Sequence, residues 1–523
     1  MYVPQTALLY RMLLPALLLA ACSPATRENR PVSAAPVPVL REFRAAWVAT
    51  VANIDWPSEP GLSDSLQQRE ALAILDSAQS LNLNAIILQV RPQCDAIYPS
   101  ELEPWTYYLS GEQGKGPATG YDPLAFWIEA AHDRGLELHA WFNPYRAHHP
   151  RGGEIGEASI VRRRPELVRK LPDGYYWLDP ALSETQDHSF AVIMDVLRRY
   201  DIDGVHFDDY FYPYGDGNFP DSTAWEAYQQ KGGKLSRADW RRDQVNRFIE
   251  RVYRAIKQEK KFVKFGLSPF GIWRPGHPPS IRGFDQYNGL YADARLWLNQ
   301  GWLDYWTPPQ LYWPTRQIPQ SYPVLLGWWA QENLKGRHLW PGLYTSRIKT
   351  GRGADENLSQ IMIARGFVPQ APGHVHFSMK ALQQSYAGIA DSLKQGPYRR
   401  QALVPPTPWL GDKNPAAPQV TTETTDDTLT VSWSHEHPES VFRWVLYTQT
   451  GDQWHYRIFD RNTRSHRIPL SETVTPPTPA DSSATPPQPT VIRREISRIA
   501  VSAVDRLGNE SAPAFEESNP RIE

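Results

Sequence analysis

Short apolar runs alternate with longer amphipathic stretches over most of the chain, from about residue 41 to about residue 395. A short apolar run bounded by turn residues predicts a buried strand, and apolar positions that recur every helical turn predict a helix. Eight strand-like runs occupy residues 44–50, 85–91, 136–143, 203–209, 263–269, 303–312, 338–344 and 373–378. The helical stretches that alternate with them are 64–80, 121–134, 186–200, 241–258, 289–300, 321–332, 355–366 and 380–393.

Strands that alternate with helices predict a parallel sheet, because each helix carries the chain back to the start of the next strand. Eight such units predict a (β/α)₈ TIM barrel over residues 41–400. The structural alternative is an open, doubly wound sheet. That alternative is weaker because no Gly-rich phosphate-binding motif follows the first strand.

The pattern changes past about residue 405, where short runs with a period of two are separated by Pro, Thr and Asp. This pattern predicts a small all-β sandwich of the fibronectin type III kind over residues 415–516. Within it, residues 473–490 are rich in Pro, Thr and Ser and are predicted to form a disordered loop.

The first residues have the pattern of an export signal. Arg11 precedes a short apolar run, and the sequence Leu-Ala-Ala-Cys ends at Cys22. A positive residue, a short apolar run and small residues before a cleavage site indicate a secretory signal, here residues 1–21. Because the cleavage site ends in cysteine, it resembles a bacterial lipoprotein signal, which implies lipidation of Cys22 and anchorage at a membrane.

The residues after Cys22 refine this interpretation. Ser23 follows the cysteine in place of Asp, which favours the periplasmic face of the outer membrane in a Gram-negative cell envelope. Residues 22–40 are rich in Pro and Ala and predict a flexible tether. Once Cys22 carries a lipid, Cys94 is the one remaining cysteine, so no intramolecular disulfide can form.

Composition narrows the choice of partner. Charged residues make up 21% of the chain and the formal net charge is -2, which does not fit a nucleic-acid binder. The chain has 20 Trp and 25 Tyr, and these rings either stack on sugars or fill a core. A polysaccharide is therefore the expected partner, together with the membrane that holds the lipid.

Candidate chemistry lies where the fourth predicted strand ends. In a barrel the active site forms at the carboxyl ends of the strands, and alternation points His206 and Asp208 toward the axis. Asp209 begins the following loop. Burial or a like charge raises the pKa of one of two adjacent carboxylic acids into a catalytic range. We predict Asp208 as the general acid/base, with Asp209 or Glu184 as its charged partner. The alternative is that these carboxylates cap a helix or order a loop.

The same alternation on the other strands predicts a polar ring with aromatic rims, which suits a carbohydrate cleft. The predicted substrate-binding residues are Asp55, Arg91, Asp95, Trp105, Trp141, Asn143, His206, Gln310, Tyr312 and Trp340. A His-x-His pair occurs at His374 and His376, but the first strand lacks the histidines that metal-dependent barrel hydrolases place there, so we predict no metal and no cofactor. No G-x-S-x-G motif is present, which makes acyl transfer the weaker hypothesis.

Seven stretches resemble the glycosyl hydrolase-like 10 family of bacterial lipoproteins. They are REFRAAWVATVANIDWPS, LQVRPQCDAIYPSELEPWTYYLSGEQG, YDPLAFWIEAAHDRGLELHAWFNPYR, DIDGVHFDDYFYP, KFGLSPFGIWR, YADARLWL and LDYWTPPQLYW. The resemblance implies a barrel glycosidase of cell-wall glycan, with peptidoglycan strands that lack stem peptides as the expected substrate and cell-division proteins as candidate partners. It places in the site Asp55, Arg91, Asp95, Asn143, Glu184, Asp208, Asp209, Gln310 and Tyr312.

Two questions stay open at this level. The mechanism is either a two-carboxylate reaction or a substrate-assisted one that uses the 2-acetamido group of the sugar. The second hypothesis for function is a non-catalytic lipoprotein that binds glycan and docks partners through its C-terminal sandwich.

Overall fold

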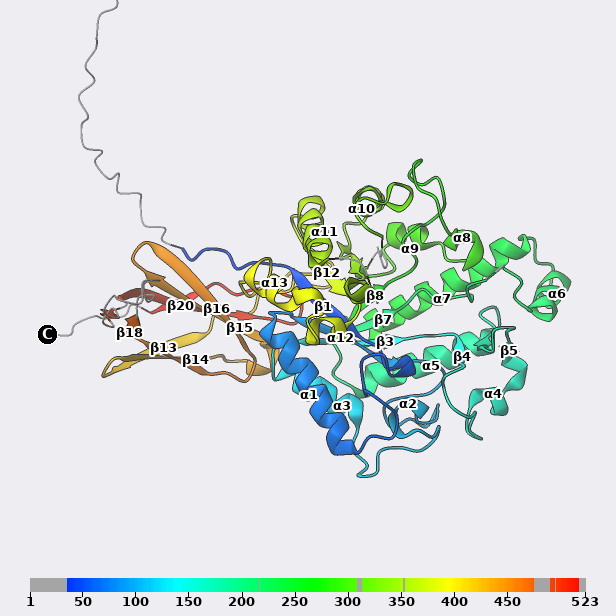
Figure 1. Cartoon of the computed structure of the whole chain (residues 1–523), viewed down its shortest axis with the longest axis horizontal. Coiled ribbons are helices and arrows are strands. Elements are labelled where there is room, and N and C mark those ends of the chain that lie inside the picture. The colour runs from blue at the N-terminus through cyan, green and yellow to red at the C-terminus, as the bar shows by residue number, and fades with distance from the viewer. Residues whose placement is uncertain are drawn as a thin grey trace, which may run out of the picture.

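The computed structural model describes residues 35–215, 217–307, 313–350, 353–474, 490–493 and 495–516. An α/β barrel is followed by a body of antiparallel sheets (Figure 1). The predicted signal peptide, Cys22 and most of the predicted tether lie outside the described residues. So does most of the loop predicted at 473–490.

The barrel strands form one parallel sheet in the order β10-β9-β8-β7-β3-β2-β1-β12-β11. Their bounds are β1 (Phe43–Val48), β2 (Ala85–Arg91), β3 (Glu137–Phe142), β7 (Gly204–Phe207), β8 (Lys264–Leu267), β9 (Tyr305–Trp306), β10 (His338–Leu339), β11 (Gly342–Leu343) and β12 (Gly373–His376). β10 and β11 are parts of one segment, which pairs with β9 on one side and with β12 on the other. The sheet therefore closes, and the predicted eight-stranded barrel is confirmed.

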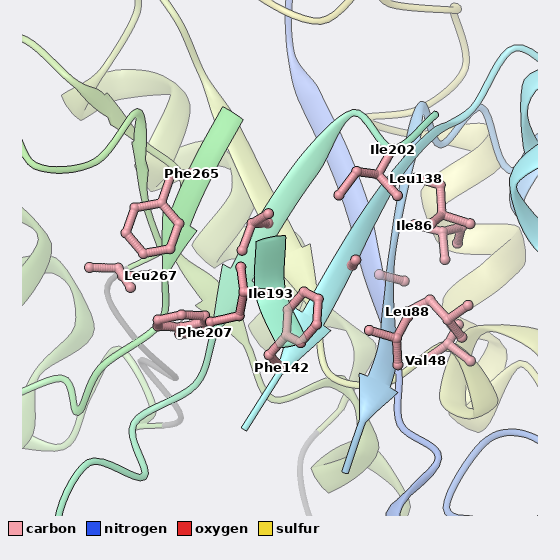
Figure 2. Close-up of a cluster of buried hydrophobic side chains, with 14 of the residues drawn as sticks. Val48, Ile86, Leu88, Leu138, Phe142, Ile193, Ile202, Phe207, Phe265 and Leu267 are labelled. Carbon is pink, nitrogen blue, oxygen red and sulfur yellow. The ribbon is translucent and has the colours of Figure 1, made fainter. Parts of the chain in front are cut away.

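Helices surround this sheet. They are α1 (Asp64–Ser80), α2 (Tyr107–Ser110), α3 (Pro123–His132), α4 (Ile160–Arg163), α5 (Ser183–Arg199), α6 (Ser222–Gln230), α7 (Arg237–Glu259), α8 (Gln286–Gly289), α9 (Ala294–Gln300), α10 (Tyr322–Glu332), α11 (Ala354–Phe367), α12 (Met379–Gln383) and α13 (Ile389–Gln395). Outward strand residues such as Leu88 and Phe207 lie in the same buried cluster as Ile193 of α5 (Figure 2). This apolar layer joins the sheet to its helices.

Helix starts follow their capping residues. At α3 the Asp122 side chain accepts hydrogen bonds from the backbone N–H groups of Leu124 (3.0 Å) and Ala125 (3.1 Å), and Pro123 occupies the first helical position. A capped N-terminus with proline just inside it is a strong helix start. The cap gives a partner to N–H groups that have none in the helix, and proline has no N–H group to satisfy.

A small sheet is inserted between β3 and α5. Its strands are β4 (Arg146–His148), β5 (Val168–Lys170) and β6 (Tyr176–Leu178), in the order β4-β6-β5. The insertion follows the carboxyl end of β3, so it lies on the mouth side of the barrel (Figure 1). The sequence pattern did not predict it.

A chain of hydrogen-bonded rings fills the barrel interior. Tyr305 hydroxyl lies 2.8 Å from His139 Nδ1 and 2.9 Å from His206 Nδ1, and the indole N–H of Trp47 donates to His206 Nε2 at 3.2 Å. A Cβ at Gly266 would lie 1.8 Å from the Tyr305 ring, so the ring can enter the axis only beside glycine. An indole N–H can only donate, and it therefore keeps His206 Nε2 unprotonated.

Trp340 also belongs to this interior. It is fully buried, and its ring lies 3.9 Å from the ring of Phe43, the first residue of β1. Phe43 marks the amino ends of the strands. The prediction that Trp340 binds substrate at the mouth is therefore wrong.

The C-terminal body is a sandwich of two antiparallel sheets. One sheet holds β13 (Gln419–Thr425), β14 (Thr428–Ser434) and β17 (Ser465–Pro469), and the other holds β16 (Gln453–Asp460), β15 (Arg443–Thr450), β20 (Ile496–Val504) and β21 (Ala514–Glu516). A separate hairpin joins β18 (Ser471–Val474) and β19 (Thr490–Arg493). Trp433 of the first sheet and Trp444 of the second share one core. Its kinship with fibronectin type III domains stays a prediction.

The sandwich packs against the end of the barrel opposite the mouth (Figure 1). Arg506 forms ion pairs with Asp201 and with Asp203, the latter at 2.6 Å. Its backbone carbonyl accepts a hydrogen bond from Lys264 Nζ (3.2 Å). Asp203 and Lys264 lie at the amino ends of β7 and β8, so polar contacts fix the sandwich under the barrel floor. No helix in the described ranges is long and apolar enough to cross a membrane.

Candidate active site at the barrel mouth

Asp208 follows directly after β7 and is held by three N–H donors. The indole of Trp141 donates at 3.0 Å, the side-chain amide of Asn143 at 3.2 Å, and the backbone of Tyr210 at 3.3 Å. Trp141 is the last inward residue of β3 and Asn143 follows that strand, so the end of β3 aims both side-chain donors at the carboxylate that ends the neighbouring strand β7. Donors of this kind favour the ionised form.

Asp209 lies beside Asp208 and is in a different environment. Its Oδ2 accepts a hydrogen bond from the Tyr214 hydroxyl, while its Oδ1 is buried with no partner among the described residues. Burial, together with the charge of Asp208, raises the pKa of Asp209 to about 7. Burial also raises the pKa of Asp208, against the lowering effects of Arg146 and the Trp141 N–H. Burial therefore raises the pKa of both carboxyls, and the adjacent charge of Asp208 raises that of Asp209 further.

Arg146 supplies the positive charge of the site. It begins β4, and its guanidinium lies 4.5 Å from the centre of the Tyr210 ring and 6.0 Å from that of Tyr175. One nitrogen donates to the Pro92 carbonyl at 3.0 Å. Because Arg146 lowers the pKa of both Asp208 and Asp209, it limits the cost of two buried carboxylates in one place.

An aromatic cavity shares one wall residue, Tyr214, with the site. It has a volume of about 630 Å³ and is lined by Tyr212, Tyr214, Phe219 and Tyr291, among others. Tyr214 is 38% exposed and connects the cavity to Asp209. Tyr212, Phe219 and Tyr291 are buried, so Tyr214 is the ring of this group that offers a face to a sugar.

The structure brings together part of the predicted site. Trp141 and Asn143 contact Asp208 directly, and His206 lies one inward position below it in the barrel interior. Trp141 uses its N–H on the carboxylate and is only 6% exposed, so it positions Asp208 rather than stacking on a sugar.

Two further predicted carboxylates order the loops around the mouth. Asp55 accepts hydrogen bonds from the backbone of Ala49 (2.9 Å) and from the Ser378 hydroxyl (2.6 Å), which ties the loop after β1 to the loop after β12. Asp95 accepts from Gln93 and Gln113, and burial raises the pKa of Asp95 to about 6. Among the described residues, neither carboxylate is hydrogen-bonded to Asp208 or Asp209.

Arg91 corrects the prediction from alternation. The β2–β3 register shifts between Gln89 and Arg91, so that Arg91 pairs with Phe142, which faces the helices. Its guanidinium is fully buried, pairs with Glu103, and donates to the Asn143 carbonyl. Arg91 therefore supports the loop that carries Asn143 and does not face the substrate.

The structure also corrects the predicted site roles of Glu184 and Trp105. Glu184 is exposed in the first turn of α5, where its carboxylate accepts from Ser183 (2.8 Å), and the structure does not bring it to Asp208. Trp105 packs its indole against Gly116, where a Cβ would lie 2.7 Å from the ring, and it lines a different hollow beside Arg199 of α5. The negative charge of Glu184 suits the N-terminus of a helix, and Trp105 holds a loop.

Gln310 and Tyr312 lie outside the described residues. Within the described part of the chain, no group of three or more His, Cys, Asp and Glu side chains is arranged to hold a metal. Sequence reasoning missed Arg146 and Tyr214. Arg146 ends the stretch that closes with NPYR, and Tyr214 directly follows the stretch DIDGVHFDDYFYP, but only the folded loops show that they converge on Asp208 and Asp209.

Comparison with known proteins places the chain in a family. Residues 42–359 match the family described as glycosyl hydrolase-like 10. Glycosyl hydrolase YngK of Bacillus subtilis is 38% identical over 490 residues, which cover 90% of this chain and 92% of that protein. Glycosyl hydrolase DigH of Escherichia coli is 38% identical over 344 residues, or 60% of this chain and 77% of that protein.

Solved structures are more distant. An alpha-L-fucosidase from Paenibacillus thiaminolyticus is 12% identical with a TM-score of 0.45, covering 73% of this chain and 52% of that one. The catalytic domain of a beta-amylase from Paenibacillus polymyxa is 13% identical with a TM-score of 0.44, covering 68% of this chain and 100% of that one. These scores are low, so the barrel is assigned from its strand pairing. On the matched residues and the long alignment with YngK, the chain belongs to the glycosyl hydrolase-like 10 family.

Proposed function

We propose that this protein is a glycoside hydrolase that cuts cell-wall glycan, specifically peptidoglycan strands that lack stem peptides. One observation carries the catalytic part of the proposal. Two adjacent buried carboxyls stand at the barrel mouth, one held by three N–H donors and the other with a pKa of about 7. Pairs of acids whose environments separate their pKa values are suited to acid/base chemistry.

The hydrogen bonds favour roles for Asp208 and Asp209 that are the reverse of those expected from sequence. Asp208, which faces only donors, is the ionised member and stabilises positive charge that develops on the sugar. Asp209 holds a proton near neutral pH and donates it to the oxygen of the leaving sugar. Water then supplies the hydroxyl of the new reducing end, and its other proton returns to the ionised Asp209. The exposed part of the Tyr214 ring offers a surface on which the sugar packs.

The envelope location is part of the same proposal. An N-terminal lipid on Cys22 would hold the protein at the periplasmic face of the outer membrane, within reach of cell-wall glycan and of cell-division proteins. The first described residues lead into β1 at the amino ends of the strands. A chain anchored from this end presents its mouth away from the anchor.

The charge state of Asp209 predicts a pH dependence. Because the reaction needs the protonated acid, kcat/KM is expected to fall about tenfold per pH unit above about pH 7. The Tyr214 hydroxyl stabilises the ionised form of Asp209, so Tyr214→Phe raises its pKa and moves this decline to higher pH. Tyr253→Phe on the outer helix α7 is the control. A decline that stays in place or moves to lower pH in Tyr214→Phe would contradict the assignment of the proton to Asp209.

The substrate is tested with a panel of polymers. Incubation with peptide-free glycan strands, chitin and starch, followed by a reducing-end assay, is expected to give new ends from the peptide-free strands. New ends from chitin or starch alone would reassign the specificity. Binding to strands without new ends would favour the non-catalytic, glycan-binding lipoprotein.

A further inference from the structure

A groove follows the seam between the barrel and the sandwich, away from the mouth. This junction groove lies between the turn at Asn82, the segment Arg399–Gln401 and residues 453–457 of β16, and its volume is about 750 Å³. A second hollow shares Arg399 and Arg400 with it, and a third shares Asn82, Gln401 and Arg457. The three hollows therefore neighbour one another along the seam.

The lining of the junction groove is positively charged. Arg399, Arg400 and Arg457 are all exposed, and the described residues of its wall include no Asp or Glu. The amide side chains of Asn82 and Gln453 complete the polar wall. Guanidinium groups recognise carboxylates by paired hydrogen bonds, and amides recognise hydroxyls, so this wall suits a ligand that carries both.

Two of the arginines are held on aromatic rings. The guanidinium of Arg400 lies 4.9 Å from the ring centre of Tyr456, and that of Arg457 lies 5.4 Å from the ring centre of Phe459. Stacking orients a planar guanidinium, and one nitrogen of Arg457 also lies 3.4 Å from His466 Nε2. The charged groups are thus oriented before a ligand arrives.

The wall that carries them is also fixed. Gln401 donates to the Ile458 carbonyl (3.2 Å) and accepts from the Ile458 N–H (2.8 Å), so it pairs with the outer edge of β16. The Tyr456 hydroxyl donates to the Gln401 carbonyl at 2.7 Å. β16 is an edge strand, and these bonds join it to the barrel side of the seam.

We propose that the junction groove is a second binding site, for a polysaccharide that carries carboxylates. We take the polymer to be a glycan from the proposed function. We take it to be anionic from the arginines that line the junction groove. Glycan strands without stem peptides fit this chemistry, because removal of the peptide frees one carboxylate on each muramic residue. A membrane surface fits less well, since no large apolar side chain is exposed in the described lining to insert between lipids.

Such a site has a consequence for catalysis on large substrates. The groove and the mouth lie at different ends of the barrel, so a polymer held in the groove keeps the mouth close to neighbouring strands. Two linked sites raise the effective concentration of the second one. Cleavage of insoluble glycan therefore depends on the groove, and cleavage of short soluble fragments does not.

The test compares Arg400→Gln/Arg457→Gln with the matched control Arg467→Gln, an exposed arginine on β17 in the other sheet. Binding is measured by calorimetry on the full chain, with peptide-free glycan strands and with the same strands after amidation of their carboxylates. The double variant is expected to bind the strands at least about tenfold more weakly. The control should bind as the wild type does, and amidation should weaken wild-type binding to a similar extent.

The outcomes separate this proposal from the catalytic one. Groove-dependent binding of strands that the wild type does not cut would retain the second site and remove the proposed function. Equal binding by the double variant and the wild type, or equal binding of amidated strands, would overturn the second site. So would groove-dependent binding of phosphatidylglycerol vesicles without binding of strands, which would assign the groove to anionic lipid.

Discussion

Asp208→Asn is expected to lower kcat on peptide-free glycan by about 10³-fold or more. The amide has the size of the carboxyl but removes the charge that the three N–H donors surround. Asp209→Asn removes the proton donor and is expected to cost about 10²- to 10⁴-fold. Initial rates from a reducing-end assay, with thermal unfolding of each variant, measure both effects.

Glu184→Gln is the informative control for these variants. Glu184 is exposed and contacts Ser183, so its amide is expected to leave the rate unchanged. Full activity in Asp208→Asn would move the catalytic carboxylate elsewhere. A large loss in Glu184→Gln would restore that residue as the charged partner expected from sequence.

Arg506→Ala is expected to lower the free energy of unfolding by about 3 kcal/mol, because it leaves a buried carboxylate with fewer partners. Arg506 donates two hydrogen bonds to Asp203 Oδ1 (3.0 and 2.6 Å), while His132 and the backbone of Leu138 satisfy Oδ2. Chemical denaturation at neutral pH measures the loss. Arg467→Ala, at an exposed position, is the control and is expected to change stability by less than about 0.5 kcal/mol.

The same ion pair predicts a pH dependence of stability. Arg506 and His132 hold the pKa of Asp203 well below its usual range in the folded state. The ion pair therefore contributes its full stabilisation of the folded state above the pKa of an unfolded Asp, about 3.9. This contribution to the free energy of unfolding is lost as pH falls below about 4. The difference in free energy of unfolding between wild type and Arg506→Ala should narrow in that pH range. A difference that is constant down to pH 3 would show that Asp203 is not the group involved.

Most of the barrel could be predicted because its signal is local. Each strand is a short apolar run between turns, and the predicted helix 64–80 coincides with α1. Alternation along β7 also placed Val205 and Phe207 toward the helices and Asp208 toward the axis, as observed. Inward or outward direction follows from a period of two wherever the strand is regular.

The failures have physical causes that a local pattern does not carry. Alternation failed at Arg91 because the strand register shifts there. It failed at Trp340 because direction alone does not give depth, and Trp340 lies near the floor beside Phe43. The roles of Arg146 and Tyr214 depend on loops that meet only in the folded chain.

The most direct test of the account is hydrolysis of peptide-free glycan strands in water labelled with oxygen-18, followed by mass spectrometry of the products. If Asp208 and Asp209 catalyse hydrolysis, each cut places one labelled oxygen at a new reducing end, and Asp208→Asn yields none. Shortened strands without label would indicate elimination in place of hydrolysis. Strands that are bound and never shortened would contradict the assignment of the mouth as a catalytic site.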